Sequence, residues 1–113
     1  MNQGDVILTP VPQADGIFKN RPAIFLREMP PYRDVLACGI STQLHQEVKG
    51  FDEVVHSADL DFSVTGLRAT SLIRLGFLTV LPRNAVIGSI GAISSQRHKR
   101  LLKRLSDYLI APR

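Results

Sequence analysis

Two arginines and one pair of hydroxyl residues are the side chains in this sequence best suited to bind an anion. Arg21 stands directly before Pro22 and an apolar run, and a fixed positive charge at the mouth of a strand favours an anion. Arg74 lies inside another apolar run, and Ser41-Thr42 follows a third. Taken alone, each arginine is more often a surface side chain that pairs with a carboxylate or extends to solvent. Their chemistry therefore depends on whether the fold brings them together.

The apolar runs that must position these residues are short and are separated by turn signals. Residues 13–16 are turn formers, and Pro22 pushes Arg21 towards extended geometry, so we expect Arg21 to end a loop. We expect strands at residues 6–11, 23–27, 34–40, 53–56 and 86–93, and either two strands or one bent strand at 71–75 and 77–81. Short, regularly spaced strands predict a small antiparallel barrel.

Two segments have helical rather than strand periodicity. Residues 42–48 begin with a hydroxyl residue and end before Gly50, which predicts one or two helical turns. At the C-terminus an apolar stripe with helical spacing follows a serine N-cap, Ser94 or Ser95, and precedes Pro112. The stripe consists of Leu101, Leu102, Leu105, Tyr108 and Leu109. A chain of 113 residues suits one domain, with the barrel at about 4–93 and the helix at about 94–110.

Composition is typical of a soluble globular protein. Hydrophobic residues make up 44% and charged residues 21%, and no apolar stretch reaches the ~18 residues that cross a bilayer. The N-terminus lacks the features of a signal peptide, and Cys38 is the only cysteine, so we expect a reducing, cytoplasmic location. The three histidines are scattered and predict no metal site or other cofactor site.

Positive charge is concentrated in the C-terminal helix. Residues 97–113 carry six basic residues and one acid, a net charge of +5, whereas residues 1–96 carry eight basic and nine acidic residues, a net of −1. The basic residues of the helix lie away from its apolar stripe, which predicts either a plain solvated face or a binding face. Those at 97–100 oppose the helix dipole, and an acidic partner would relieve that cost. His98 falls on the apolar side, where we expect it to pack.

Taken in order, several short motifs make the chain resemble the PemK/MazF family of toxin-antitoxin ribonucleases, which includes the Kid toxin. The resemblance covers nearly the whole chain, and its specificity comes from the order of the pieces. They are Gly4-Asp5-Val6, Arg21-Pro22-Ala23, Ile40-Ser41-Thr42, the segment from Gly66-Leu67 to Ser71-Leu72-Ile73-Arg74-Leu75, and Ile90-Gly91 before the terminal helix.

The resemblance implies a mainly β fold, an SH3-like barrel of the CcdB/Kid/MazF type with added helices, as one domain over residues 1–113. It implies a homodimer that binds single-stranded RNA in a groove and is neutralised by a cognate antitoxin protein. Family members cut RNA without a metal: the 2′-hydroxyl attacks its own phosphate and leaves a 2′,3′-cyclic phosphate and a 5′-hydroxyl. That chemistry needs a base, an acid and fixed positive charge against the phosphorane.

Residue by residue, the resemblance nominates Arg21, Ser41 and Arg74 as catalytic. Arg21 matches the family's arginine before proline, Arg74 matches a second arginine, and Ser41 replaces the family's active-site threonine. Arg21, Arg74, Lys19 and Thr42 are the expected RNA contacts. One departure concerns the general base, because Gly76 stands where Kid-like members have an aspartate.

Three other residues are candidates to replace that base, namely His45, His56 and Asp15.

Two further interpretations stay open. In the first, the chain is a non-catalytic binding module on the same barrel and acts on a protein, as the related CcdB toxin acts on DNA gyrase. Gly76, which removes the expected carboxylate, favours this interpretation. In the second, the chain is a general nucleic-acid binder that uses its basic C-terminal helix, and its affinity for RNA or DNA falls steeply as the salt concentration rises. A role of Ser41-Thr42 as a plain helix cap is compatible with each of these.

Overall fold

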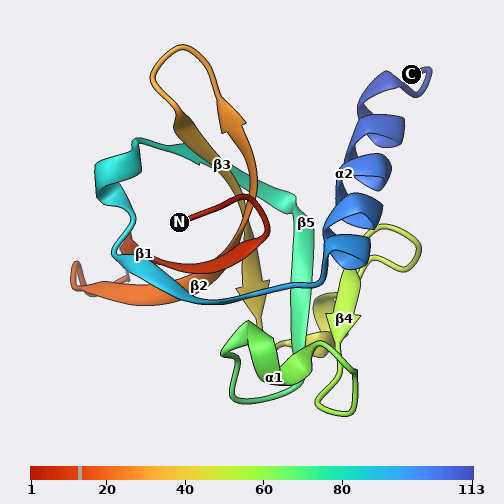
Figure 1. The fold of residues 1–113 in the computed structure, drawn as a ribbon, viewed down its shortest axis with the longest axis horizontal. Coiled ribbons are helices and arrows are strands. Elements are labelled where there is room, and N and C mark those ends of the chain that lie inside the picture. Colours follow the sequence, from red (N-terminus) through yellow and green to blue (C-terminus); the bar gives the residue numbers. More distant parts are fainter. Residues whose placement is uncertain (13) are drawn as a thin grey trace.

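The structure of the protein is a computed structural model that describes residues 1–12 and 14–113, drawn as a ribbon in Figure 1. The first three strands follow one another directly, and from the third strand onward each strand is followed by a helical segment. In chain order the elements are β1 (Asp5–Pro12), β2 (Phe18–Met29), β3 (Asp34–Ser41), a 3-10 helix (Leu44–Gln46), β4 (Glu53–Val55), α1 (Phe62–Thr65), β5 (Ser71–Leu81), a second 3-10 helix (Arg83–Ala85), β6 (Gly88–Ala92) and α2 (Ser95–Ile110).

The strands form one curled antiparallel sheet in the order β4-β5-β3-β2-β1-β6. The pairing register shifts between Phe25 and Arg27 of β2, and between Cys38 and Gly39 of β3. Such bulges bend strands and increase their twist, and here they curl the sheet into a half-barrel (Figure 1). The mainly β barrel with a C-terminal helix, expected from the sequence, is confirmed.

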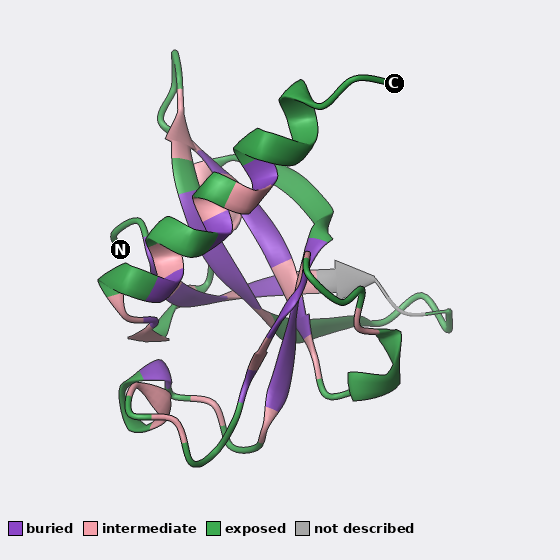
Figure 2. Ribbon diagram, turned by 90° about the vertical axis from the view of Figure 1, so that its right-hand side faces the viewer, coloured by how far each residue is buried: buried purple, intermediate pink, exposed green. Residues whose placement is uncertain are grey.

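The core fills the inside of the curled sheet and is covered by α2. Leu101 and Leu105 of α2 are buried in a cluster with apolar residues of five strands, among them Ile24, Cys38 and Ile73. Burial of each leucine stabilises the fold by about 1.5–3 kcal/mol. Figure 2 shows that the buried positions of α2 face the strands, while its last turns are exposed. The C-terminal part of the predicted apolar stripe, Tyr108 and Leu109, is therefore outside the core.

Cys38 lies in the core, and His98 packs at its edge, as predicted for His98. Cys38 is fully buried, and desolvation raises the pKa of its thiol to about 12, which makes it an inert packing residue. His98 lies at the edge of the core, where its Nε2 is 2.8 Å from the carbonyl oxygen of Leu26.

Two glycines close the barrel by letting backbones touch. A Cβ at Gly66 would lie 2.2 Å from the carbonyl oxygen of Ile90, and a Cβ at Gly91 would lie 2.3 Å from that of Val64. Gly66 also has φ +74, the left-handed conformation that ends α1. Both close approaches join α1 to β6, which explains why these two glycines stand in the motifs.

Several predicted boundaries were wrong. β2 begins at Phe18, so Arg21 lies inside a strand opposite Thr9 instead of ending a loop. Cross-strand pairing with β1 extends the strand through Pro22, which needs no backbone donor at its own position. Of the helix predicted at 42–48 only the 3-10 turn Leu44–Gln46 forms.

Elsewhere the differences are smaller. β5 is one bent strand, β6 is shorter than predicted, and α1 was not predicted at all. In the turn predicted at 13–16, residue 13 lies outside the described residues, and the other three form the turn and bend before β2. Across the described residues no helix has the length and apolar character to span a membrane.

Candidate functional site

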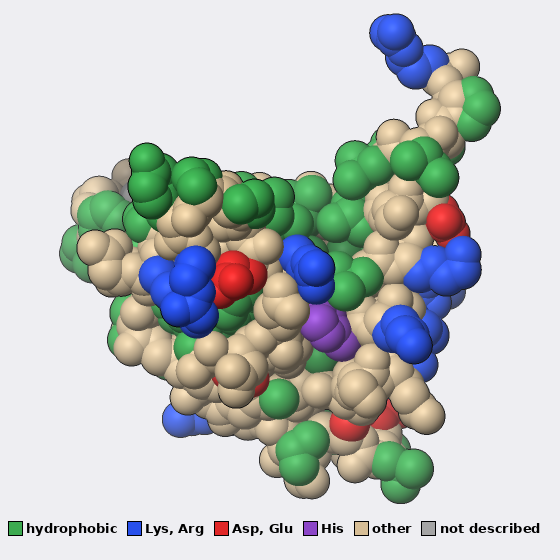
Figure 3. Space-filling view, turned by 45° about the horizontal axis from the view of Figure 1, so that its top comes forward, with side chains coloured by type: hydrophobic (Ala, Val, Ile, Leu, Met, Phe, Trp, Pro, Cys, Tyr) green, Lys and Arg blue, Asp and Glu red, His purple; other side chains and the backbone are tan. Residues whose placement is uncertain are grey.

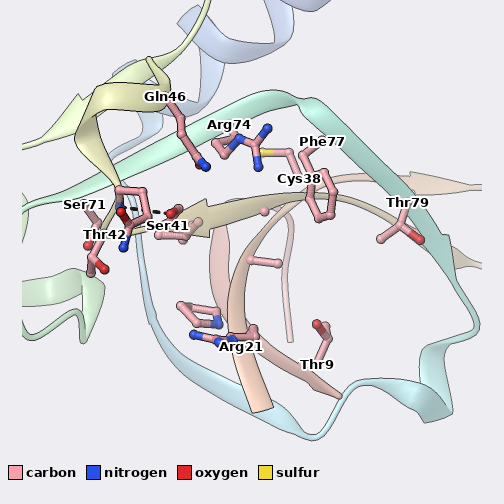
Figure 4. Close-up of a pocket in the computed structure, with 15 residues that line it drawn as sticks. Thr9, Arg21, Cys38, Ser41, Thr42, Gln46, Ser71, Arg74, Phe77 and Thr79 are labelled. Atoms are coloured by element: carbon pink, nitrogen blue, oxygen red, sulfur yellow. Dashed lines mark hydrogen bonds between the residues drawn. The ribbon is translucent and has the colours of Figure 1, made fainter. Parts of the chain in front are cut away.

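A pocket of about 460 Å³ opens on the face of the sheet where β2, β3 and β5 run side by side. Figure 4 shows Arg21 and Arg74 on opposite sides of this pocket and Ser41 and Thr42 at one end of it. The remaining polar side chains that line it include Thr9, Gln43, Gln46, Ser71 and Thr79. Three elements distant in the sequence therefore bring the predicted residues together.

The strand register explains this meeting. Ala23 of β2 pairs with Gly39 of β3, and Gly39 pairs with Arg74 of β5. Residues two apart in a strand share a face. Arg21 is two residues before Ala23 and Ser41 is two after Gly39, so both side chains lie on the face that carries Arg74.

Ser41 is oriented by its own backbone. Its Oγ accepts a hydrogen bond of 3.0 Å from the backbone N–H of Gln43, two residues on. This is a local serine turn, and the hydroxyl does not cap the 3-10 helix that follows, whose N-cap residue is Gln43. With the oxygen already accepting a hydrogen bond, the hydroxyl hydrogen is available to donate to an anion in the pocket.

The two pocket arginines have no carboxylate partner in the described part of the chain. Neither Arg21 nor Arg74 takes part in an ion pair among residues 1–12 and 14–113, and Arg21 is exposed. The Cζ of Arg74 instead lies 5.1 Å from the ring centroid of Phe77. Two unneutralised guanidinium groups around one pocket give it a positive potential that favours an anion.

The remaining expected contacts are placed differently. Thr42 lines the pocket and is exposed, whereas Lys19 is exposed on β2 and does not line it. Lys19 shares a strand face with Arg21, since the two are two residues apart. It extends the basic character of that face beyond the pocket.

Phe77 is the pocket residue that strand periodicity alone would assign to the wrong face. It is three positions after Arg74, so in a regular strand the two side chains would point to opposite faces. The register shift opposite Cys38 and Gly39 places the extra residues of β5 in a bulge, and both side chains reach the pocket. Gly76 was the signal in the sequence, because a glycine inside a strand often marks a bulge.

Comparison with protein families gives a match over residues 2–109 to the family described as PemK-like, MazF-like toxin of type II toxin-antitoxin system. The chain belongs to this family. The match covers nearly the whole chain and includes every residue of the pocket. No curated protein matches the chain significantly.

Within this PemK/MazF fold, Gly76 does not lie in the pocket wall. A Cβ at position 76 would lie 3.5 Å from Cε2 of Phe51, and Phe51 lines a separate hollow beside α2. A side chain at 76 would therefore point towards Phe51. None of the three candidate replacement bases lines the pocket either: Asp15, His45 and His56 all lie elsewhere, although His45 adjoins Gln46.

The pocket wall thus contains arginine, hydroxyl and amide groups, and among the described residues neither a carboxylate nor an imidazole. Over the same described residues, no three His, Cys, Asp or Glu side chains gather as a group that could hold a metal ion. The pocket chemistry is that of anion binding and charge stabilisation.

The basic residues of α2 form a second arginine cluster, and the prediction that they lie on a solvated or binding face is wrong for Arg97, which is buried. Arg97 is buried and binds three carboxylates, with contacts of 2.7 Å to Glu53, 3.0 Å to Asp59 and 2.9 Å to Asp61. Arg100 and Arg104 bind the two oxygens of Glu53 at 2.7 and 2.9 Å. We call these six residues the helix latch. Figure 3 shows acidic and basic side chains together along α2.

The helix latch supplies the acidic partner that the start of α2 requires. Asp61 also accepts the backbone N–H of Ser94, and the Ser94 side chain accepts the N–H of Arg97 as N-cap. The hydrogen bond from Arg97 lowers the pKa of Asp61 to about 2. The hydrogen bond from the His56 backbone N–H, followed by that from Arg97, also lowers the pKa of Asp59. The carboxylates stay ionised beside the positive end of the helix dipole.

Proposed function

We propose that this toxin is a metal-independent endoribonuclease that cleaves single-stranded RNA and leaves a 2′,3′-cyclic phosphate and a 5′-hydroxyl. The observation that carries the proposal is the pocket in which Arg21 and Arg74, without carboxylate partners in the described part of the chain, meet the oriented hydroxyl of Ser41. Family membership supports the same activity.

In the proposed reaction the 2′-oxygen bonds to the adjacent phosphorus and the bond from phosphorus to the 5′-oxygen breaks. The 2′-hydroxyl loses its proton and the leaving 5′-oxygen gains one. Arg21 and Arg74 donate to the non-bridging oxygens, whose negative charge grows in the transition state, and Ser41 donates a further hydrogen bond. Lys19 and Thr42 contact the RNA beside the cleaved phosphate.

The acceptor of the 2′-hydroxyl proton is not assigned to a side chain of the pocket wall. The described lining residues supply donors and neutral oxygens, so their contribution is to stabilise charge and to align the 2′-oxygen with the phosphorus.

We further propose that the protein works in the cytoplasm as a homodimer and is neutralised by a separate antitoxin. The family description, a toxin of a type II toxin-antitoxin system, supports the antitoxin. The resemblance supports the homodimer, and the single cysteine, which is free and buried, supports a reducing, cytoplasmic location.

The test is incubation of the purified protein with mixed-sequence single-stranded RNA and excess chelator, followed by identification of the fragment ends. Cleavage with cyclic-phosphate ends is expected. Intact RNA at high protein concentration, or cleavage that requires an added divalent metal, would contradict the mechanism. Arg21→Ala, which removes an exposed side chain, serves as the control against a contaminating nuclease.

A second candidate function is a binding module of the CcdB kind that acts without cutting RNA. The absence of a carboxylate or imidazole from the described pocket wall favours it. The two candidates separate in a pull-down from cell extract treated with ribonuclease: a protein retained by the wild type and lost by Arg74→Ala, together with uncut RNA in the first assay, would support the binding module.

A further inference from the structure

Phe77 is an aromatic side chain in the pocket wall that the proposed reaction does not use. Its exposed fraction is 60%, although a phenylalanine of this size is usually buried, and it gains little hydrophobic stabilisation there. Its ring lies beside Arg74, whose Cζ is 5.1 Å from the ring centroid, within the range of a cation–π contact. Figure 4 shows the two side chains next to each other at one wall of the pocket.

Gly39 makes room for this ring. A Cβ at position 39 would lie 2.7 Å from Cδ1 of Phe77 and 3.4 Å from Cε1, so the ring rests directly on the backbone of β3. Gly39 is also the cross-strand partner of Arg74. The bulge in β5 and the missing side chain at 39 together place the ring against the guanidinium.

We propose that Phe77 is a positioning residue that holds the guanidinium of Arg74 towards the pocket. This inference rests on the proposed nuclease function, in which Arg74 meets the phosphate. Arg74 has no ion-pair partner in the described part of the chain, so the ring restricts a side chain that is otherwise free to turn into solvent. A carboxylate in the same place would neutralise the guanidinium, whereas an aromatic ring orients it and leaves its positive charge available to a phosphate.

Single-turnover cleavage by Phe77→Leu and Phe77→Tyr tests the proposal. Leucine keeps an apolar side chain at an exposed site but removes the ring face, and we expect a roughly three- to tenfold lower rate at saturating RNA. Tyrosine keeps the ring face and should retain the wild-type rate. Tyr32→Leu, the same change at an aromatic residue that is 80% exposed and outside the pocket, is the matched control and should cleave normally.

A double-mutant cycle with Arg74→Ala decides whether Phe77 acts through Arg74. We expect Phe77→Leu to cause no further loss when Arg74 is already alanine, because the contact it removes is gone. An equal loss in both backgrounds would overturn the proposal and would indicate that Phe77 stacks on a nucleobase instead. An unchanged rate in Phe77→Leu would also overturn it.

A second readout needs no nuclease activity, so failure of the proposed function and failure of this inference can be told apart. The ¹⁵N heteronuclear NOE of the Arg74 Nε–Hε group, assigned by its loss in Arg74→Lys, reports side-chain order. We expect this NOE to fall in Phe77→Leu and in Gly39→Ala, whose added Cβ displaces the ring, and to persist in Phe77→Tyr. Equal NOE values in wild type and Phe77→Leu would overturn the inference, whether or not the protein cuts RNA.

Discussion

The pocket and the helix latch both gather arginines, but the two regions treat the charge in opposite ways. In the latch, Arg97 is buried and its donors are taken up by Glu53, Asp59 and Asp61. In the pocket, Arg21 and Arg74 line a wall that also contains hydroxyls, two amides and an aromatic ring, and among these described residues only the ring contacts an arginine, Arg74. The concentration of positive charge in the sequence made the arginines of α2 candidates for a binding face. Their carboxylate partners show that they are structural, whereas an arginine without such a partner is available to a ligand.

The largest effect is expected from Arg97→Leu, which should lower the free energy of unfolding by about 3 kcal/mol because it leaves the nearly buried carboxylate of Asp61 without its ionic partner. Glu53 keeps Arg100 and Arg104, so the loss falls mainly on Asp61, whose side chain is 12% exposed. Urea denaturation followed by circular dichroism measures it. The matched control is Lys103→Leu, which breaks an exposed pair with Asp107 and should change stability by less than about 0.5 kcal/mol. Similar losses in both variants would show that the latch is not structural.

Arg21→Ala should have the opposite profile. We expect RNA cleavage to fall roughly 100- to 1000-fold, as when one donor to a developing charge is removed, with denaturation unchanged because the side chain is exposed and has no ion pair in the described chain. Arg21→Lys keeps the charge but loses the planar fork, so its activity should lie between those of alanine and wild type. An Arg21→Ala protein that is destabilised but fully active would show that Arg21, like Arg97 in the latch, is structural and does not serve catalysis.

Much of the barrel was predictable because strand signals and turn residues are local. The start of β2 was not, because Phe18 to Arg21 are exposed and polar or mixed, and only cross-strand pairing with β1 makes them a strand. The latch was missed because its ion pairs join residues 36 to 51 positions apart, which periodicity on α2 alone cannot show. In the pocket, Arg21, Ser41, Thr42 and Arg74 were predicted together, and Phe77 required the bulge.

A carboxylate introduced into the pocket should partly neutralise its arginines, as the carboxylates of the latch neutralise Arg97. Thr42→Glu places an acid on an exposed lining residue near two unneutralised guanidinium groups. We expect affinity for an uncleavable 2′-O-methyl RNA to fall roughly tenfold through competition for the arginines and repulsion of phosphate, with stability unchanged or slightly raised. Fluorescence anisotropy measures the affinity, and Thr42→Gln is the uncharged control. Equal affinities of the two variants would argue against a phosphate site.

Acid should weaken the latch before it affects the pocket. The pKa of Asp61 is lowered to about 2 from its ordinary value of 3.8, so its stabilising contribution is complete above about pH 4 and is lost as the pH falls towards 2. Stability measured across this window should decline, and Asp61→Asn should flatten part of the decline while starting from a lower stability at neutral pH. An identical decline in wild type and Asp61→Asn would place the acid-sensitive group elsewhere.

The smallest effect is expected from Gly76→Asp, although it restores the carboxylate of Kid-like members. The added Cβ would lie 3.5 Å from Phe51, an ordinary contact, and it would point towards Phe51 instead of into the pocket. A carboxylate there neither reaches the 2′-hydroxyl nor neutralises the pocket, so cleavage should stay within about threefold of wild type, since no interaction in the transition state changes. A rate gain of tenfold or more would show that β5 turns its bulge towards the pocket when RNA binds.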